Sequence, residues 1–151
     1  MPARSSEKDI HRFLAAHPYL IDSRFKGARI QNELSSSNGR LDILIEQRQR
    51  HTIVELKKVS LDESAVEQLE RYVETFSDKF RLTSYHYLVG KSPTDPARFR
   101  RKLGKCAFKI HARFLGIHIP LTFVFNDQLR RYEGDGAPEN GISMNRVSFL
   151  L

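Results

Sequence analysis

Asp42, Glu55 and Lys57 are the residues of this 151-residue sequence whose types and spacing best suit chemistry. Asp42 interrupts the apolar run 41–45, and Glu55 and Lys57 interrupt a second run, 53–57. Two carboxylates that meet in a sheet repel each other unless one is protonated or a cation lies between them. Mg²⁺ or Mn²⁺ takes such oxygen ligands, lowers the pKa of a bound water and neutralises a phosphate oxygen. The pattern therefore indicates metal-assisted hydrolysis of a phosphate ester, in which Lys57 orients the water or stabilises the developing charge.

These side chains meet only if the two runs are neighbouring antiparallel strands. Side chains alternate between the faces of a strand, which places Glu55 and Lys57 together. In the other strand, Asp42 lies on the face opposite to Leu41, Ile43 and Ile45. A two-residue turn at Arg48 and Gln49 pairs positions whose numbers sum to 97, which sets Asp42 against Glu55. Arg-Gln lacks the Asn-Gly chemistry that specifies such a turn, and an isolated Glu-x-Lys is also typical of a solvated strand face.

Two helices carry polar residues that could reach the same site. Glu7 precedes Ile10 by three residues and Leu14 by seven, so it lies on the inward stripe of a first helix. The alternative is an acid that the dipole at the helix N-terminus favours. Gln68 and Tyr72 are one turn apart and flank the apolar stripe of a second helix that Asp62 caps. Their alternative roles are a solvated residue and a residue at the rim of the core.

Positive charge favours a polyanionic partner. The net charge is +7 and the pI about 9.8, values that nucleic-acid-binding proteins share with ribosomal, membrane-surface and merely soluble ones. Seven Lys or Arg residues and no acid occur between Arg98 and Arg113, which helical spacing assigns to one helix over 95–116. That helix either binds phosphates or is simply solvated. The residues expected to contact nucleic acid are Arg40, Lys58, Arg98, Arg101, Lys102, Lys105 and Lys109.

The order of elements predicts one domain, 1–151, of the α/β (α+β) class. A mixed central β-sheet flanked by helices follows from the order αβββαβαβ. The expected strands are 28–34, 41–47, 52–59, 84–89, 117–125 and a terminal strand 142–151, with a loop at 133–140. Cys106 is the only cysteine, so the sequence has no internal disulfide. Neither a membrane span nor a secretory signal is present, which makes a cytoplasmic location the expectation.

A family resemblance rests on three segments of the sequence. Gly39-Arg40-Leu41-Asp42-Ile43-Leu44, Ile53-Val54-Glu55-Leu56-Lys57-Lys58 and Gln68-Leu69-Glu70-Arg71-Tyr72 resemble the catalytic domain of NucS-type (EndoMS-type) endonucleases of the PD-(D/E)XK superfamily. The resemblance covers roughly 7–72, and 85–125 in element order alone. It implies a restriction-endonuclease-like core, metal ligands at Glu7, Asp42 and Glu55, a catalytic lysine at Lys57, and accessory residues at Gln68 and Tyr72 beside the scissile phosphate.

The sequence also differs from the family pattern in two respects that affect the expected function. Leu41 replaces the proline of the superfamily's name, and the N-terminal dimerisation and DNA-binding domain of NucS-type enzymes does not precede the first helix, which suggests a free-standing catalytic domain. The expectation is a DNA endonuclease that uses Mg²⁺ or Mn²⁺, acting as a monomer or a homodimer. The alternatives are an inactive DNA-binding module of nuclease fold, a nuclease subunit that needs a partner, and a protein-interaction domain.

Overall fold

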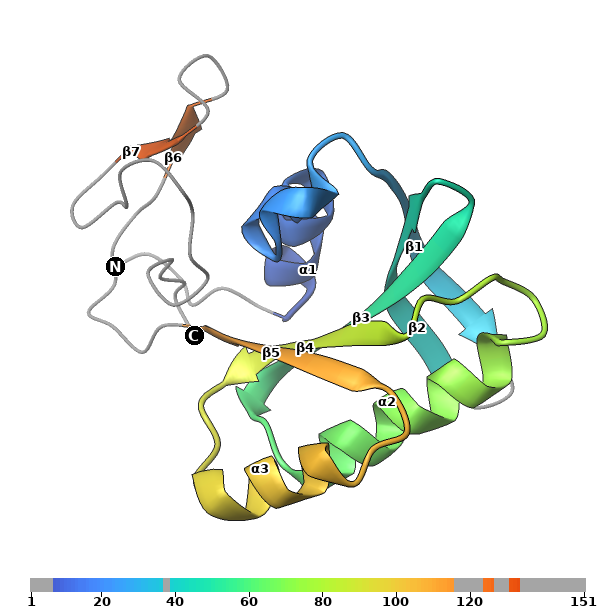
Figure 1. Ribbon diagram of the computed structural model, residues 1–151. Coiled ribbons are helices and arrows are strands. Elements are labelled where there is room, and N and C mark those ends of the chain that lie inside the picture. The colour runs from blue at the N-terminus through green and yellow to red at the C-terminus, as the bar shows by residue number, and fades with distance from the viewer. Residues whose placement is uncertain (1–6, 37–38, 116–123, 127–130, 134–151) are drawn as a thin grey trace.

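A five-stranded mixed sheet is the centre of the computed structural model, which describes residues 7–36, 39–115, 124–126 and 131–133 (Figure 1). The strands lie side by side in chain order: β1 (Arg29–Ser36), β2 (Gly39–Gln47), β3 (Arg50–Ser60), β4 (Tyr85–Lys91) and β5 (Lys109–Leu115). β1 to β3 pair antiparallel, whereas β3 to β5 pair parallel. The predicted mixed sheet and the order αβββαβαβ are therefore confirmed. β6 (Val124–Asn126) and β7 (Arg131–Glu133) form a separate two-stranded sheet.

Helices cover both faces of the sheet. One face carries α1 (Glu7–Ala16) and the short 3₁₀ turns η1 (Pro18–Leu20) and η2 (Ser23–Phe25), and the other carries α2 (Glu63–Phe76) and α3 (Pro96–Gly104) (Figure 1). Two apolar clusters result because alternate strand residues point to opposite faces. The cluster on the α1 side includes Ile10, Leu14, Phe25, Ile43, Ile45, Val54, Leu56 and Tyr87. The cluster on the α2 side includes Leu41, Leu44, Ile53, Val66, Leu69, Tyr72, Phe76 and Leu88.

Both helices on the α2 side begin where the sequence predicts. The Asp62 carboxylate accepts a hydrogen bond from the Ala65 amide at 3.0 Å, and the Asp95 carboxylate accepts one from the Arg98 amide at 3.1 Å. Each caps an amide that the helix itself leaves unpaired. In the described part of the chain, no helix is long and apolar enough to cross a membrane.

The predicted helix over 95–116 is wrong beyond Gly104. α3 ends there, and 109–115 form β5, whose pairing with β4 begins where the Lys109 amide bonds the Ser84 carbonyl at 3.0 Å. Phe108, Ile110, Ala112 and Phe114 follow the two-residue period of a strand and pack on the α2-side cluster. The predicted strand 117–125 lies outside the described residues except for its last two positions, which belong to β6. The predicted terminal strand 142–151 lies wholly outside them.

Candidate active site at the end of the β2–β3 hairpin

The β2–β3 hairpin has the predicted register. Ile43 pairs with Val54 and Gln47 with Arg50, so the paired numbers sum to 97, and Arg48 and Gln49 form the two-residue turn. The backbone pairing of the two strands extends to Ile43 and Val54, and Asp42 and Glu55 lie directly beyond that pair. There the strands are joined by a side chain: the Leu56 amide donates to Asp42 Oδ2 at 2.9 Å. The two acids are thus brought together on the α2 face of the sheet.

Glu55 is almost completely buried from solvent. Its exposed fraction is 2%, and Oε1 is buried without a hydrogen-bond partner. Burial, and after it the neighbouring Asp42 carboxylate, raise the pKa of Glu55 to about 9. The Lys57 ammonium opposes this rise, with Nζ 3.9 Å from Oε2. A carboxyl that is protonated at neutral pH and has an oxygen free of donors suits a cation that replaces the proton.

A chain of hydrogen bonds leads from Lys57 across α2 to β2. Lys57 Nζ donates to Gln68 Oε1 at 2.5 Å, Gln68 Nε2 donates to the Tyr72 hydroxyl at 3.1 Å, and that hydroxyl donates to the Arg40 carbonyl at 3.1 Å. Tyr72 is 2% exposed, so its hydroxyl needs these partners. The structure therefore brings Gln68 and Tyr72 to the site, as the sequence indicates, and links Lys57 to the strand of Asp42.

Gly39 makes room for this chain. Its φ of +115° is a conformation that side chains rarely adopt, and a Cβ atom there would lie 2.9 Å from the Tyr72 hydroxyl. We expect Gly39→Ala to lower the free energy of unfolding by roughly 1–3 kcal/mol, through backbone strain and displacement of Tyr72. Thermal unfolding measures this. The control is Gly104→Ala at the end of α3, where a Cβ meets nothing within 4 Å and no loss is expected. Equal effects at both positions would contradict the assignment.

Leu41 is an exception to the predicted alternation. It packs with Leu44 in the α2-side cluster, not with Ile43 and Ile45. The physical reason lies in β1, where Glu33 has a φ of +53° and breaks the pleat beside Asp42. The pairs on either side of this point are Asn32 with Ile43 and Leu34 with Leu41. The prediction that Leu41 shares a face with Ile43 and Ile45 is therefore wrong.

The other predicted site residues occupy varied positions. Glu7 is the first residue of α1, which packs on the face opposite to α2; its side chain lies outside the described residues, so its role as a ligand stays a prediction. Arg40 is exposed, with Nη1 3.7 Å from Glu33 Oε2, and Lys58 is half-buried.

The basic residues expected on one helix are divided between α3, the following loop and β5. Arg98 pairs with Glu63 of α2, and Lys102 Nζ lies 3.6 Å from Glu67 and 3.7 Å from Glu70. Arg101, Lys105 and Lys109 are exposed. Since α2 carboxylates neutralise Arg98 and Lys102, they offer less free charge to a phosphate than the sequence indicates.

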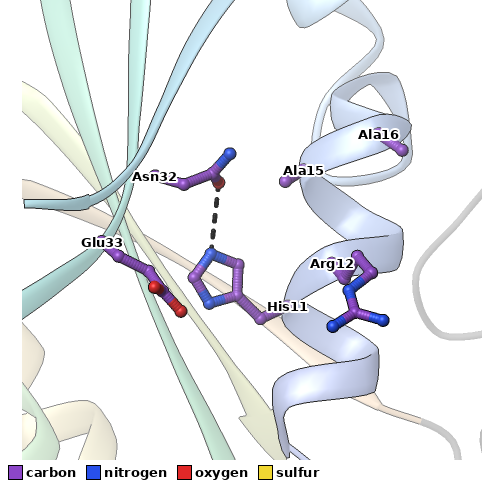
Figure 2. A pocket seen from close by; sticks show the side chains of 6 residues that line it. All are labelled: His11, Arg12, Ala15, Ala16, Asn32 and Glu33. Atoms are coloured by element: carbon purple, nitrogen blue, oxygen red, sulfur yellow. Dashed lines mark hydrogen bonds between the residues drawn. The ribbon is translucent and has the colours of Figure 1, made fainter.

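A pocket of about 440 Å³ between α1 and β1 was not predicted (Figure 2). His11 points from α1 toward β1, and its Nε2 lies 3.2 Å from Asn32 Oδ1. Arg12, Ala15, Ala16 and Glu33 complete the lining. Glu33 lies between Asn32 and Leu34, which pair with Ile43 and Leu41, so the pocket adjoins the strand that carries Asp42.

Comparisons with known proteins place the chain in a family. The family model for the Endonuclease NucS C-terminal domain matches residues 6–98, a range that contains both acids, Lys57 and the hydrogen-bonded chain through Tyr72. The chain belongs to the Endonuclease NucS C-terminal domain family. Relatives in this family include Endonuclease NucS of Methanocaldococcus jannaschii, 37% identical over 78 residues, and Endonuclease NucS of Aeropyrum pernix, 33% identical over 97 residues.

The matched region is a part of these NucS proteins. It makes up 51% and 62% of this chain but 29% and 35% of the two relatives. Solved structures share the fold: an EndoMS–dsDNA2 complex has a TM-score of 0.58 at 22% identity, over 76% of this chain and 46% of that one. A repair endonuclease from Pyrococcus abyssi has a TM-score of 0.57 at 20% identity, over 76% of this chain and 49% of that one.

Proposed function

We propose that this chain is a nuclease domain of the PD-(D/E)XK type that hydrolyses phosphodiester bonds of DNA. The observation that carries the proposal is the buried Glu55 carboxyl opposite Asp42, with an oxygen that no protein donor satisfies and Lys57 beside it. The names of the relatives, Endonuclease NucS, and of the EndoMS–dsDNA2 complex support DNA as the substrate.

Asp42 and Glu55 would hold one or two Mg²⁺ or Mn²⁺ ions. Such an ion supplies a water of lowered pKa and neutralises a non-bridging phosphate oxygen. Glu55 would release its proton when it holds an ion, and the positive charge of that ion would offset the repulsion between the two carboxylates. The Leu56 amide holds the Asp42 carboxylate in place through a hydrogen bond to Oδ2.

Lys57 has the position to assist the reaction from the protein side. Its ammonium lies 3.9 Å from Glu55 Oε2 and is held by Gln68, whose own amide is held by Tyr72. From there it donates a hydrogen bond to the attacking water or to the phosphate oxygen on which charge develops. Gln68 and Tyr72 are positioning residues in this arrangement, because they act through Lys57.

The proposal is tested by cleavage of labelled single-stranded, duplex, flap and mismatched DNA, and of single-stranded RNA, in Mg²⁺, Mn²⁺ or EDTA. We expect cleavage of at least one DNA substrate with either metal and none in EDTA. A matched preparation of Glu55→Gln shows whether a cut belongs to this site. Binding without cleavage in both metals would sink the proposal in favour of a DNA-binding module or a subunit that needs a partner. Cleavage of RNA alone would correct the substrate.

A further inference from the structure

The turn of the β2–β3 hairpin is strained. Arg48 has a φ of +50° and Gln49 a φ of +64°, so both central residues adopt the left-handed conformation. Two-residue turns of this kind strongly favour Asn-Gly, because a Cβ atom is disfavoured at each position. Neither residue here relieves that strain. Strained backbone of this sort is typical of positions where a side chain is needed for something other than stability.

Exposed cations surround this turn. We use "tip patch" for Lys26, Arg29, Arg48, Arg50 and Arg81, all of which are exposed. Hydrogen bonds join the segments that carry them: Gln47 Nε2 donates to the Arg24 carbonyl at 2.6 Å, and the His51 amide donates to the Arg81 carbonyl at 2.8 Å. The patch is therefore a fixed surface at the end of the hairpin away from Asp42 and Glu55.

The charge of the tip patch is largely free. Arg29 lies 3.9 Å from Glu46, but none of the ion pairs among the described residues involves Lys26, Arg48, Arg50 or Arg81. On α3, by contrast, both Arg98 and Lys102 are paired with α2 acids. Arg50 Nη2 also donates to the Leu82 carbonyl at 3.4 Å, a bond that leaves its charge unneutralised. Exposed guanidinium groups outside ion pairs bind phosphate oxygens in two-pronged geometry and release counterions from DNA.

We propose that the tip patch binds the sugar-phosphate backbone of DNA away from the cut, with Arg48 and Arg50 as its main contacts. The inference rests on the proposed nuclease function and adds a second contact to it. Arg48 lies six positions after Asp42 and directly follows β2, a span of about 20 Å at ~3.3 Å per residue. The phosphates of one DNA strand are ~3.4 Å apart along the helix axis, so on a duplex that lies along β2 this span corresponds to about six nucleotides.

Binding to a 30-base-pair duplex tests the tip patch without any cleavage. Fluorescence anisotropy in EDTA, at 50 to 200 mM salt, compares wild type with Arg48→Gln/Arg50→Gln. Two lost phosphate contacts lower the slope of log affinity against log salt by about 1.8, so the variant loses ~10-fold less affinity over this range. The charge-matched control is Arg98→Gln/Lys102→Gln, for which we expect a smaller change. Equal slopes for wild type and the tip variant, or an equal drop in the control, would overturn the inference.

A second variant separates binding from folding. Arg48→Asn/Gln49→Gly gives the turn its preferred residues, so we expect Tm to rise by roughly 3 °C or more while DNA affinity falls. A rise in Tm with unchanged affinity would refute a role of Arg48 in binding. Failure of this inference can be distinguished from failure of the proposed function. If wild type cleaves DNA but the tip variant has the same salt slope as wild type, DNA binding by the tip patch is rejected and the nuclease function stands. If the salt slopes differ but wild type cleaves no DNA, the nuclease function is rejected and binding by the tip patch stands.

Discussion

Glu55→Gln is expected to reduce DNA cleavage at least about a thousandfold, because the metal it would hold supplies several kcal/mol of stabilisation to the reaction. The fold should survive, since Glu55 already carries a proton at neutral pH when no metal is bound and glutamine has nearly the same shape. Single-turnover cleavage with excess protein measures the loss, and circular dichroism reports the fold. Glu74→Gln, an exposed acid on α2, is the matched control and should keep full activity.

Asp42→Asn separates the ligand role of Asp42 from its structural role. The asparagine oxygen can still accept the hydrogen bond of the Leu56 amide, so the strands stay paired while the charge is lost. We expect the same loss of cleavage as for Glu55→Gln. Cleavage within tenfold of wild type in both variants would contradict a metal site at these acids.

The stability of the metal-free protein is expected to fall as pH rises from 7 to 9. The pKa of Glu55 is about 9 in the folded state and 4.5 ordinarily, so in this window the folded protein holds a proton that the unfolded chain has released. The free energy of unfolding therefore decreases by at most about 1.4 kcal/mol per pH unit. Urea denaturation in EDTA at pH 7, 8 and 9 measures the slope, and Glu55→Gln should flatten it.

Above pH 7, the change of stability with pH reports Glu55 without a contribution from the buried His86. Burial lowers the pKa of His86 to about 4, so its contribution to stability rises with pH between 4 and 6.5 and opposes that of Glu55 there. Excess Mg²⁺ should stabilise wild type more at pH 8.5 than at pH 6.5, because the ion competes with the Glu55 proton. Two results would contradict this account. One is a free energy of unfolding that falls with pH as steeply in Glu55→Gln as in wild type, and the other is stabilisation of that variant by Mg²⁺.

The hairpin could be predicted from local pattern alone. The two apolar runs that Asp42 and Glu55 interrupt indicate neighbouring strands, and the number of residues between them admits one tight turn, which determines the register. The caps at Asp62 and Asp95 are equally local. The order of helices and strands can be predicted from such local signals, because the hydrophobic period identifies each element and the capping residues mark its ends.

The predictions that are wrong or missing concern features that depend on residues far apart in the sequence. From Leu103 to Phe114 apolar residues fit both a helical and a strand period, and pairing with β4 decides in favour of the strand. The positive φ of Glu33, beside which Leu41 changes face, has no signature in the sequence around it. The α1–β1 pocket likewise requires knowledge of which strand α1 lies beside.

The hydrogen bond from the Leu56 amide to Asp42 makes one carboxylate part of the sheet itself. Asp42 replaces a backbone rung between β2 and β3, and Glu55 precedes Leu56 in the same strand. The separation of the two acids is therefore determined when the hairpin closes, before any ion arrives, and needs no freezing of long side chains at the moment of binding. The site is preorganised: the entropy of assembling it is lost in folding, so the ion meets ligands already in place.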